Sequence, residues 1–168
     1  MAKGIEIERK YVIKMPDISL LREKDGFSES EIMQIYLSSE SGVTHRIRKR
    51  SFFGATAYSE TKKTRIDSMS SIEEENEISE AEFKKLSYKI KPGTSPIIKK
   101  RYTFEFSGVV FEIDVYPAWQ STAIMETELE SREVSAKMPP FIEILREVTG
   151  DFRYSNASMS REFPEELI

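Results

Sequence analysis

The stretch IEIERKYVI, residues 5–13, alternates apolar and charged side chains at a period of two. Residues two apart in a β-strand lie on the same face of the sheet. Glu6, Glu8 and Lys10 therefore share one face, and the apolar residues take the other, interrupted only by Arg9. The stretch predicts a strand with one charged face and one apolar face.

Similar runs, rich in β-branched and aromatic residues, recur along the whole chain. Turn signals such as Ser41-Gly42, Ser107-Gly108 and Pro117 separate them. No repeat, low-complexity tract or Pro/Gly-rich linker divides the chain, so we expect a single domain over residues 1–168. The predicted strands lie at about 5–13, 32–38, 43–51, 56–64, 72–78, 97–106, 109–116 and 123–131.

Within the predicted strands, the charged residues keep one parity and often one sign. An open sheet with one face in water would account for any single strand. It does not account for purely acidic or purely basic sets, because like charges on one strand face repel each other. We therefore expect groups of opposite sign to meet each set. The sets are Arg46, Arg48 and Arg50; Glu60 and Lys62; Glu73, Glu75 and Glu77; Lys99 and Arg101; Glu112 and Asp114; and Glu126, Glu128 and Glu130.

Closing eight strands into a barrel would turn these charged faces toward one another and remove the exposed sheet edges. Such an interior cannot be dry, since desolvation costs several kcal/mol per ion unless each ion is paired. We therefore predict an α+β, mainly β fold: a closed eight-stranded antiparallel β-barrel with a wet, charged lumen and a few peripheral helices. The lumen is expected to hold a multiply charged ligand together with metal ions.

Three helices are predicted around the barrel. Pro16-Asp17 begins a short helix that ends near Asp25-Gly26. Ser79 and Glu82 form a capping box before a second helix. Pro139-Pro140 begins a third, in which Phe141, Ile144, Leu145 and Val148 form an apolar stripe that Gly150 ends.

The composition excludes several classes of function. The chain has 25 Lys and Arg against 29 Asp and Glu, a net charge of −4, so neither sign dominates and no nucleic-acid partner is expected. The absence of cysteine excludes disulfides and thiolate sites, and the single histidine, His45, cannot build a histidine-based metal site. No apolar run approaches a signal peptide or a membrane span, which predicts a cytoplasmic protein without a membrane partner.

The charged segments, in their order, resemble the CYTH superfamily, also called triphosphate tunnel metalloenzymes, from Gly4 to about Ser160. A lone Glu-x-Glu-x-Lys is weak support, whereas a series of ordered matches is strong. The matching segments are Glu6-Ile7-Glu8-Arg9-Lys10, Gln34-Ile35-Tyr36-Leu37, Arg46-Ile47-Arg48, Lys62, Glu75-Asn76-Glu77-Ile78, Lys99-Lys100-Arg101-Tyr102, Glu112-Ile113-Asp114-Val115, Glu126-Thr127-Glu128-Leu129, Glu147-Val148-Thr149 and Arg153-Tyr154-Ser155-Asn156.

The resemblance implies a tunnel that binds a small-molecule triphosphate with Mg²⁺ or Mn²⁺, ions that prefer oxygen ligands. The expected metal ligands are Glu6, Glu8, Glu77, Glu126 and Glu128. The expected substrate-binding bases are Lys10, Arg46, Arg48, Lys62, Lys99 and Arg101. The expected catalytic residues are Lys99 and Tyr36, at the leaving oxygen, and Glu75 and Asp114, as second-ion ligands or water-positioning groups. The simpler alternatives are salt bridges for the carboxylates and a wall position for Tyr36.

The leading hypothesis is a metal-dependent triphosphatase that hydrolyses inorganic tripolyphosphate, nucleoside triphosphates or both. A class IV-type adenylyl cyclase would use the same tunnel to make cyclic AMP from ATP. A non-catalytic binder of polyphosphate or nucleotides is a third hypothesis, which the acidic pairs disfavour because phosphate binding alone does not need them. The sequence is compatible with a monomer or a homodimer.

Overall fold

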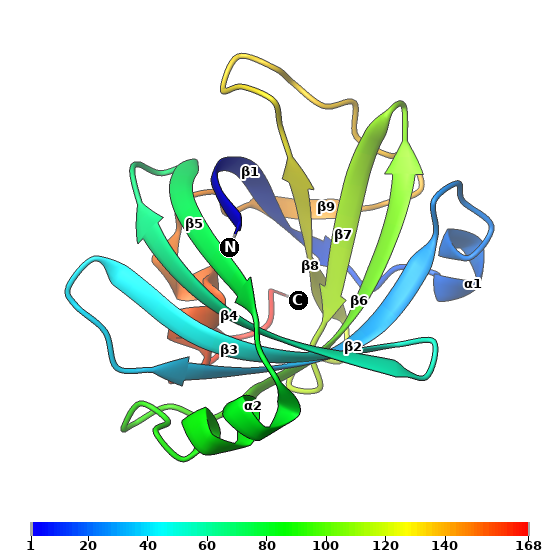
Figure 1. Ribbon diagram of the computed structural model, residues 1–168. Coiled ribbons are helices and arrows are strands. Elements are labelled where there is room, and N and C mark those ends of the chain that lie inside the picture. The colour runs from blue at the N-terminus through cyan, green and yellow to red at the C-terminus, as the bar shows by residue number, and fades with distance from the viewer. Residues whose placement is uncertain (1, 168) are drawn as a thin grey trace.

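A ring of eight antiparallel strands forms the centre of the computed structural model, which describes residues 2–167, with side chains for residues 4–167 (Figure 1). β8 pairs with β1, and β1 pairs in turn with β5, which closes the ring. The predicted closed eight-stranded antiparallel barrel is thereby confirmed. In ring order the strands are β1 (Ala2–Lys14), β5 (Ser70–Glu77), β4 (Ala55–Arg65), β3 (Val43–Phe52), β2 (Ser28–Leu37), β6 (Ile97–Phe106), β7 (Val109–Val115) and β8 (Thr122–Glu128).

A short additional strand, β9 (Ile144–Glu147), lies along the part of β1 that β5 leaves free. β5 pairs only with residues 2–7 of β1, and β9 pairs with residues 11–13. The predicted third helix, beginning at Pro139-Pro140, is therefore wrong. Backbone groups on the open edge of β1 need hydrogen-bond partners, and a strand over residues 144–147 supplies them, which a helix cannot.

The other two predicted helices are present. α1 (Ile18–Leu21) is capped by Asp17, whose Oδ1 accepts from the Ser19 amide at 3.0 Å. α2 (Glu80–Ser87) begins after Ser79, whose Oγ accepts from the Glu82 amide at 3.1 Å. Near the C-terminus, a 3₁₀ turn, η1 (Phe152–Tyr154), leads into α3 (Asn156–Met159). Within residues 2–167, no helix has the length and apolarity that a membrane span requires.

The apolar faces of the strands point outward and are covered there. α2 lies against the outer side of the β2–β3–β4 region (Figure 1), where Phe83 packs with Ile35, Leu37 and Ile47. A second cluster covers the outside of β1, β6, β7 and β8 and includes Leu21 of α1. Because these two apolar clusters lie outside the barrel wall, the charged faces of the strands are left to line the interior.

One end of the interior is filled by a third apolar cluster. Further along the inner faces of the strands, the charged positions give way to Val12, Ile97 and Ile124. Tyr154 and Met159 from the C-terminal turn and helix pack against them. The cluster also contains Trp119, which is buried and donates from Nε1 to the Pro164 carbonyl at 3.1 Å, so Trp119 belongs to the core. The C-terminal segment thus closes this end.

The β3–β4 hairpin corrects one predicted strand face. Its loop is only two residues long, with positive φ at Phe53 (47°) and Gly54 (77°), which places Phe52 opposite Ala55. This turn geometry is typical of tight hairpins. It pairs even positions of β3 with odd positions of β4, so Lys63 faces the interior and Lys62 is exposed outside. The predicted inward face of Glu60 and Lys62 is therefore wrong.

Candidate active site

The barrel encloses a cavity of about 530 Å³ whose wall consists mainly of ionisable side chains. Eleven of the predicted site residues line it; the exceptions are Asp114, Lys62 and Glu77. The carboxylates of the wall are Glu6, Glu8, Glu73, Glu75, Glu112, Glu126 and Glu128, the bases are Lys10, Arg46, Arg48, Lys63, Arg65, Lys99 and Arg101, and Tyr36 completes the predicted set.

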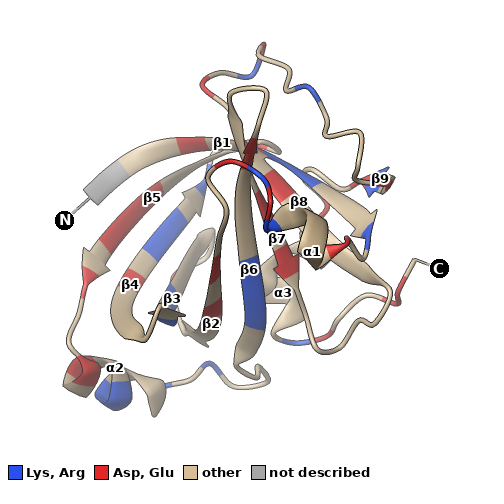
Figure 2. Cartoon of the chain, turned by 90° about the vertical axis from the view of Figure 1, so that its right-hand side faces the viewer, with Lys and Arg blue, Asp and Glu red and all other residues tan. Residues whose placement is uncertain are grey.

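The two signs occupy separate arcs of the ring. All seven carboxylates come from β7, β8, β1 and β5, which are consecutive neighbours in the barrel. With the exception of Lys10 on β1, the bases come from β4, β3 and β6, on the other side. Figure 2 shows acidic positions along β5 and basic positions on β4 and β6. A ligand between the arcs would face cationic groups on one side and carboxylates on the other.

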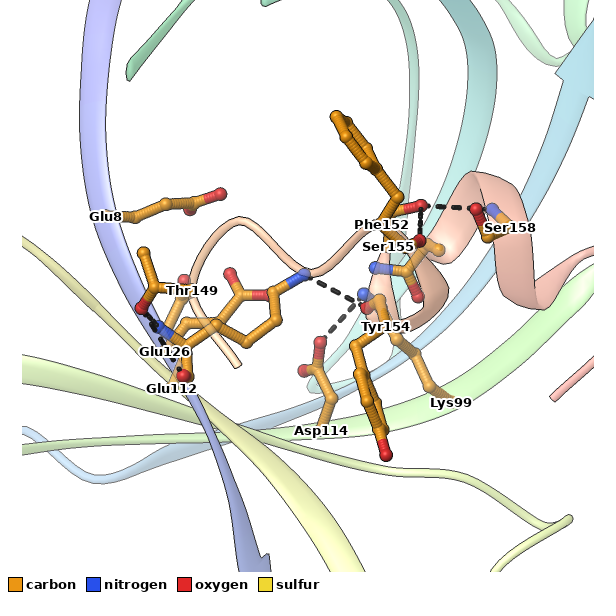
Figure 3. Close-up of polar contacts among 12 residues, drawn as sticks. Glu8, Lys99, Glu112, Asp114, Glu126, Thr149, Phe152, Tyr154, Ser155 and Ser158 are labelled. Carbon is orange, nitrogen blue, oxygen red and sulfur yellow. Dashed lines mark hydrogen bonds and ion pairs between the residues drawn. The ribbon is translucent and has the colours of Figure 1, made fainter. Parts of the chain in front are cut away.

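Asp114 lies behind the basic arc and holds two of its members. Its oxygens accept from Arg101 Nε at 2.8 Å and from Arg101 Nη2 at 2.9 Å. Lys99 Nζ donates to Oδ2 at 2.8 Å, as Figure 3 shows. All three residues are buried. The guanidinium of Arg101 and the ammonium of Lys99 outweigh the effect of burial and hold the pKa of Asp114 far below its usual range. With both oxygens engaged, Asp114 supports the bases from outside the cavity wall.

Lys99 is the base with the most altered acidity. Burial lowers its pKa to about 7, and the neighbouring charges of Arg101 and Arg48 act in the same direction against the attraction of Asp114. A lysine with a pKa near neutrality can exist in both protonation states under ordinary conditions. The position predicted to be catalytic therefore has an acidity suited to proton transfer.

Two arginines of β3 present donors to the cavity in different ways. Arg48 donates from Nε at 3.0 Å and from Nη2 at 2.6 Å to Oε1 of the buried Gln34. Arg46 bonds Glu73 through Nη2 at 3.3 Å, while its buried Nε has no partner among the described residues. An unpaired buried donor is costly, and a phosphate oxygen would satisfy it.

The acidic arc contains carboxylates that crowd one another. Glu8 lies directly opposite Glu128 across the β1–β8 pair, and Glu126 lies opposite Glu112. Burial and a hydrogen bond shared with Glu73 raise the pKa of Glu6 to about 8. The carboxylate of Glu126, followed by burial, raises the pKa of Glu8. The arc therefore carries more negative charge than the protein itself neutralises.

The pKa of Glu126 is lowered instead, because Lys10 pairs with it. Burial alone would raise its pKa, but Lys10, whose Nζ lies 3.3 Å from Oε1, brings it down to about 2. The same Nζ donates to the Tyr154 carbonyl at 3.2 Å, which ties Lys10 to the C-terminal turn. Lys10 thus links the acidic arc to the segment that closes the barrel.

The groups of the acidic arc are of the type that binds a hard divalent cation. All its ligands are carboxylate oxygens, which Mg²⁺ and Mn²⁺ prefer. Burial and the neighbouring carboxylates raise the pKa values of Glu6 and Glu8 in spite of the attraction of Lys63, which lies 3.5 Å from Glu8. As the side chains stand, no three acidic or histidine groups among the described residues converge on a single point. An ion would therefore draw these carboxylates together.

Sequence reasoning missed part of the wall. Lys63 and Arg65 were missed because the strand face of β4 was assigned with the wrong parity. Phe152, Ser155 and Ser158 line the cavity from the C-terminal segment (Figure 3), for which no strand pattern could indicate a position. Glu77 shares the inward parity of Glu73 but is exposed at the end of β5, away from the cavity. Outside the barrel, His45 contacts Glu60 at 2.7 Å.

No protein-family model and no curated protein sequence matches this chain. Solved structures do. The inorganic triphosphatase NE1496 aligns with a TM-score of 0.60 and 26% identity, covering 95% of this chain and 96% of that one. The Hippeastrum protein HpAC1, described as a candidate adenylyl cyclase with a dominant triphosphatase activity, aligns at 0.53 and 14% identity over 76% and 81% of the two chains. A candidate adenylate cyclase from Bacillus halodurans aligns at 0.55 and 18% identity over 79% and 84%. The last two likenesses concern the fold alone.

Proposed function

Since the chain belongs, by its structure, to the CYTH or triphosphate tunnel metalloenzyme superfamily, we propose that it is a metal-dependent triphosphatase that hydrolyses tripolyphosphate, nucleoside triphosphates or both. One observation carries the proposal: the cavity wall is divided into a basic arc and an acidic arc. A triphosphate with its divalent cations has the complementary arrangement, anionic oxygens on one side and cations on the other. The triphosphatase activity of the structural neighbour NE1496 supports the same assignment.

The basic arc is suited to gripping a chain of phosphates. Arg46 and Arg48 offer guanidinium forks, which match the geometry of phosphate oxygens, and Lys63 and Lys99 act as point charges. Asp114 fixes Arg101 and Lys99 before the ligand arrives, which reduces the ordering cost of binding. Gripping several phosphates at once would favour a triphosphate over a monophosphate.

The acidic arc supplies the reason to expect hydrolysis in addition to binding. Glu6, Glu8, Glu126 and Glu128 would hold Mg²⁺ or Mn²⁺, with Glu75 as a second-ion ligand or water-positioning group. When bound, such an ion neutralises phosphate charge and acidifies a water molecule. A pure phosphate binder would gain nothing from this arc, because carboxylates repel phosphate.

Proton transfer to the leaving oxygen would fall to Lys99 or Tyr36. Attack of water on a terminal phosphorus breaks the bridging P–O bond, and the departing phosphate oxygen then needs a proton. Lys99, with its pKa near 7, can carry one at neutral pH. Tyr36 lines the same cavity with its hydroxyl attached to the Gln34 amide.

The test is release of inorganic phosphate from tripolyphosphate, ATP and thiamine triphosphate, each with Mg²⁺, with Mn²⁺ and with chelator. We expect turnover only with a metal, and loss of turnover in Arg48→Ala but not in the exposed control Arg22→Ala. Parallel measurement of cyclic AMP separates a triphosphatase from a cyclase. Cyclic AMP as the main product from ATP, or tight tripolyphosphate binding without turnover in either metal, would refute the proposal.

A further inference from the structure

Gln34 is a fully buried amide that joins two functional groups of the cavity wall. It lies on β2, directly opposite Arg48 on β3, and has no exposed surface. Its Oε1 accepts both hydrogen bonds from Arg48, at 3.0 and 2.6 Å, and its Nε2 donates to the Tyr36 hydroxyl oxygen at 3.0 Å. One side chain thus contacts an expected phosphate-binding base and an expected proton donor.

The chemistry of the partners fixes which way the amide points. An amide oxygen and nitrogen can be exchanged by a flip, but arginine has only donors. A flipped Gln34 would place its NH₂ group against the two N–H groups of Arg48. Gln34 must therefore present its oxygen to Arg48 and its nitrogen to Tyr36.

This orientation decides the role of the Tyr36 hydroxyl. A phenol has one proton to donate and lone pairs to accept. Because Gln34 Nε2 can only donate, the Tyr36 oxygen must accept from it, and the proton of Tyr36 is left for another acceptor. Tyr36 lines the cavity, so an oxygen of a bound phosphate can serve as this acceptor.

We propose that Gln34 is a positioning residue that fixes Tyr36 as a hydrogen-bond donor toward the phosphate chain while it holds the Arg48 guanidinium in place. The inference rests on the proposed function and deepens it. Gln34 does not touch the substrate. It orients the two groups that do, so its effect on turnover should pass through Tyr36.

The informative substitution is Gln34→Glu, which keeps the size and reverses one hydrogen bond. A carboxylate still accepts from Arg48, but it can only accept from Tyr36 as well, so the phenol proton turns away from the cavity. We expect kcat for tripolyphosphate to fall about 100-fold, the lower end of the range for general acid catalysis, with a rise in KM of no more than about tenfold. In a Tyr36→Phe background, Gln34→Glu should change kcat less than about threefold, because the group it acts through is gone.

A binding measurement tests the inference independently of turnover. Calorimetry with the non-hydrolysable analogue imidotriphosphate, on the same four variants, should show a loss of about tenfold in affinity for each single variant, as expected for one hydrogen bond to a charged group. The double variant should bind no more weakly than Tyr36→Phe. If wild type binds the analogue but releases no phosphate, the proposed function fails while the binding cycle still decides the role of Gln34.

Two results would overturn the inference. The first is an additive cycle, in which Gln34→Glu has its full effect without the Tyr36 hydroxyl, since Gln34 would then act through Arg48 alone. The second is that all three variants bind the analogue with the same affinity as the wild type. If thermal unfolding shows that Gln34→Glu does not fold, Gln34→Met, which removes both contacts at similar length, replaces it in the cycle. Its effect through Arg48 should persist in the Tyr36→Phe background, whereas its effect through Tyr36 should disappear there, and an undiminished effect in that background would again overturn the inference.

Discussion

Replacing Asp114 by Asn should destabilise the protein strongly, because Asp114 pairs with two buried bases at once. In the variant, the amide oxygen can face Lys99 Nζ and Arg101 Nη2, which now donate to Oδ2 at 2.8 and 2.9 Å, or it can face Arg101 Nε, but not both. In either orientation at least one charge-assisted hydrogen bond is lost, the NH₂ group faces a donor of Arg101, and the negative charge between the two bases is gone. Breaking a buried ion pair from one side costs about 3–5 kcal/mol.

For a domain of this size, that loss corresponds to a decrease in Tm of about 6–20 °C. Lys99 can escape part of the penalty by losing its proton, since burial already lowers its pKa to about 7, so the lower half of the range is expected above neutral pH. The assay is thermal unfolding followed by circular dichroism, in chelator. The exposed control Glu80→Gln, which removes the pair with Lys84 on α2, should change stability by less than about 0.5 kcal/mol.

The pH dependence of the stability difference between the wild type and Asp114→Asn gives a second check. The pKa of Asp114 is depressed in the folded state, so its contribution is fully present above the unfolded value near 3.8 and is lost as the pH falls toward the folded value. The gap between wild type and Asp114→Asn should therefore be larger at pH 6 than at pH 3. A variant within 1 kcal/mol of wild type at pH 6, or a gap that widens in acid, would refute the assigned role.

Three further predictions follow from the two arcs. The affinity for Mg²⁺ or Mn²⁺ should rise about tenfold between pH 7 and pH 9, because an ion must displace the proton that Glu6 holds with a pKa of about 8. Titration calorimetry should show a weaker pH dependence of metal affinity in Glu6→Gln. A pH dependence that this substitution leaves unchanged would contradict the assignment of Glu6. Lys63→Ala should weaken tripolyphosphate binding at least tenfold, while its neighbour Lys62→Ala, on the outer face, should stay within twofold; equal effects would mean that the register of β4 is misassigned. Tyr36→Phe should lower kcat about 100-fold and leave the fold intact, and full activity in this variant would leave proton donation to Lys99 alone.

The barrel could be predicted from the sequence because its decisive feature is local. Charged residues at a period of two reveal the inner face of each strand without any knowledge of its neighbours, as in Glu6, Glu8 and Lys10. Opposite charges on different strands then imply closure. The same reasoning identified most of the cavity wall, since every inward charge of β1, β3, β6 and β8 that it assigned to the site lies there.

The errors arose where the fold depends on pairing. Glu60 and Lys62 have the period-two spacing expected of inward-facing charges. Only the two-residue loop at Phe53-Gly54 shows that odd positions of β4 face inward. Residues 139–150 carry a helical spacing, but the unpaired edge of β1 makes residues 144–147 a strand. Local spacing cannot show that an edge elsewhere in the chain needs a partner.

The support network behind the site is also a product of pairing. Asp114 contacts Arg101 because the Ser107-Gly108 turn pairs Phe106 with Val109, and the same β6–β7 register then pairs Arg101 with Asp114. Gln34 meets Arg48 because β2 and β3 are aligned. The sequence indicated which side chains carry the charge, whereas the register determines which of them hold one another in place.

The most direct measurement is a crystal structure with imidotriphosphate and Mn²⁺, whose anomalous signal locates the metal. The phosphate chain should lie against Arg46, Arg48 and Arg101, with manganese between it and Glu6, Glu8 or Glu126. Phosphates bound on the outer surface of the barrel, or manganese away from the acidic arc, would contradict the account.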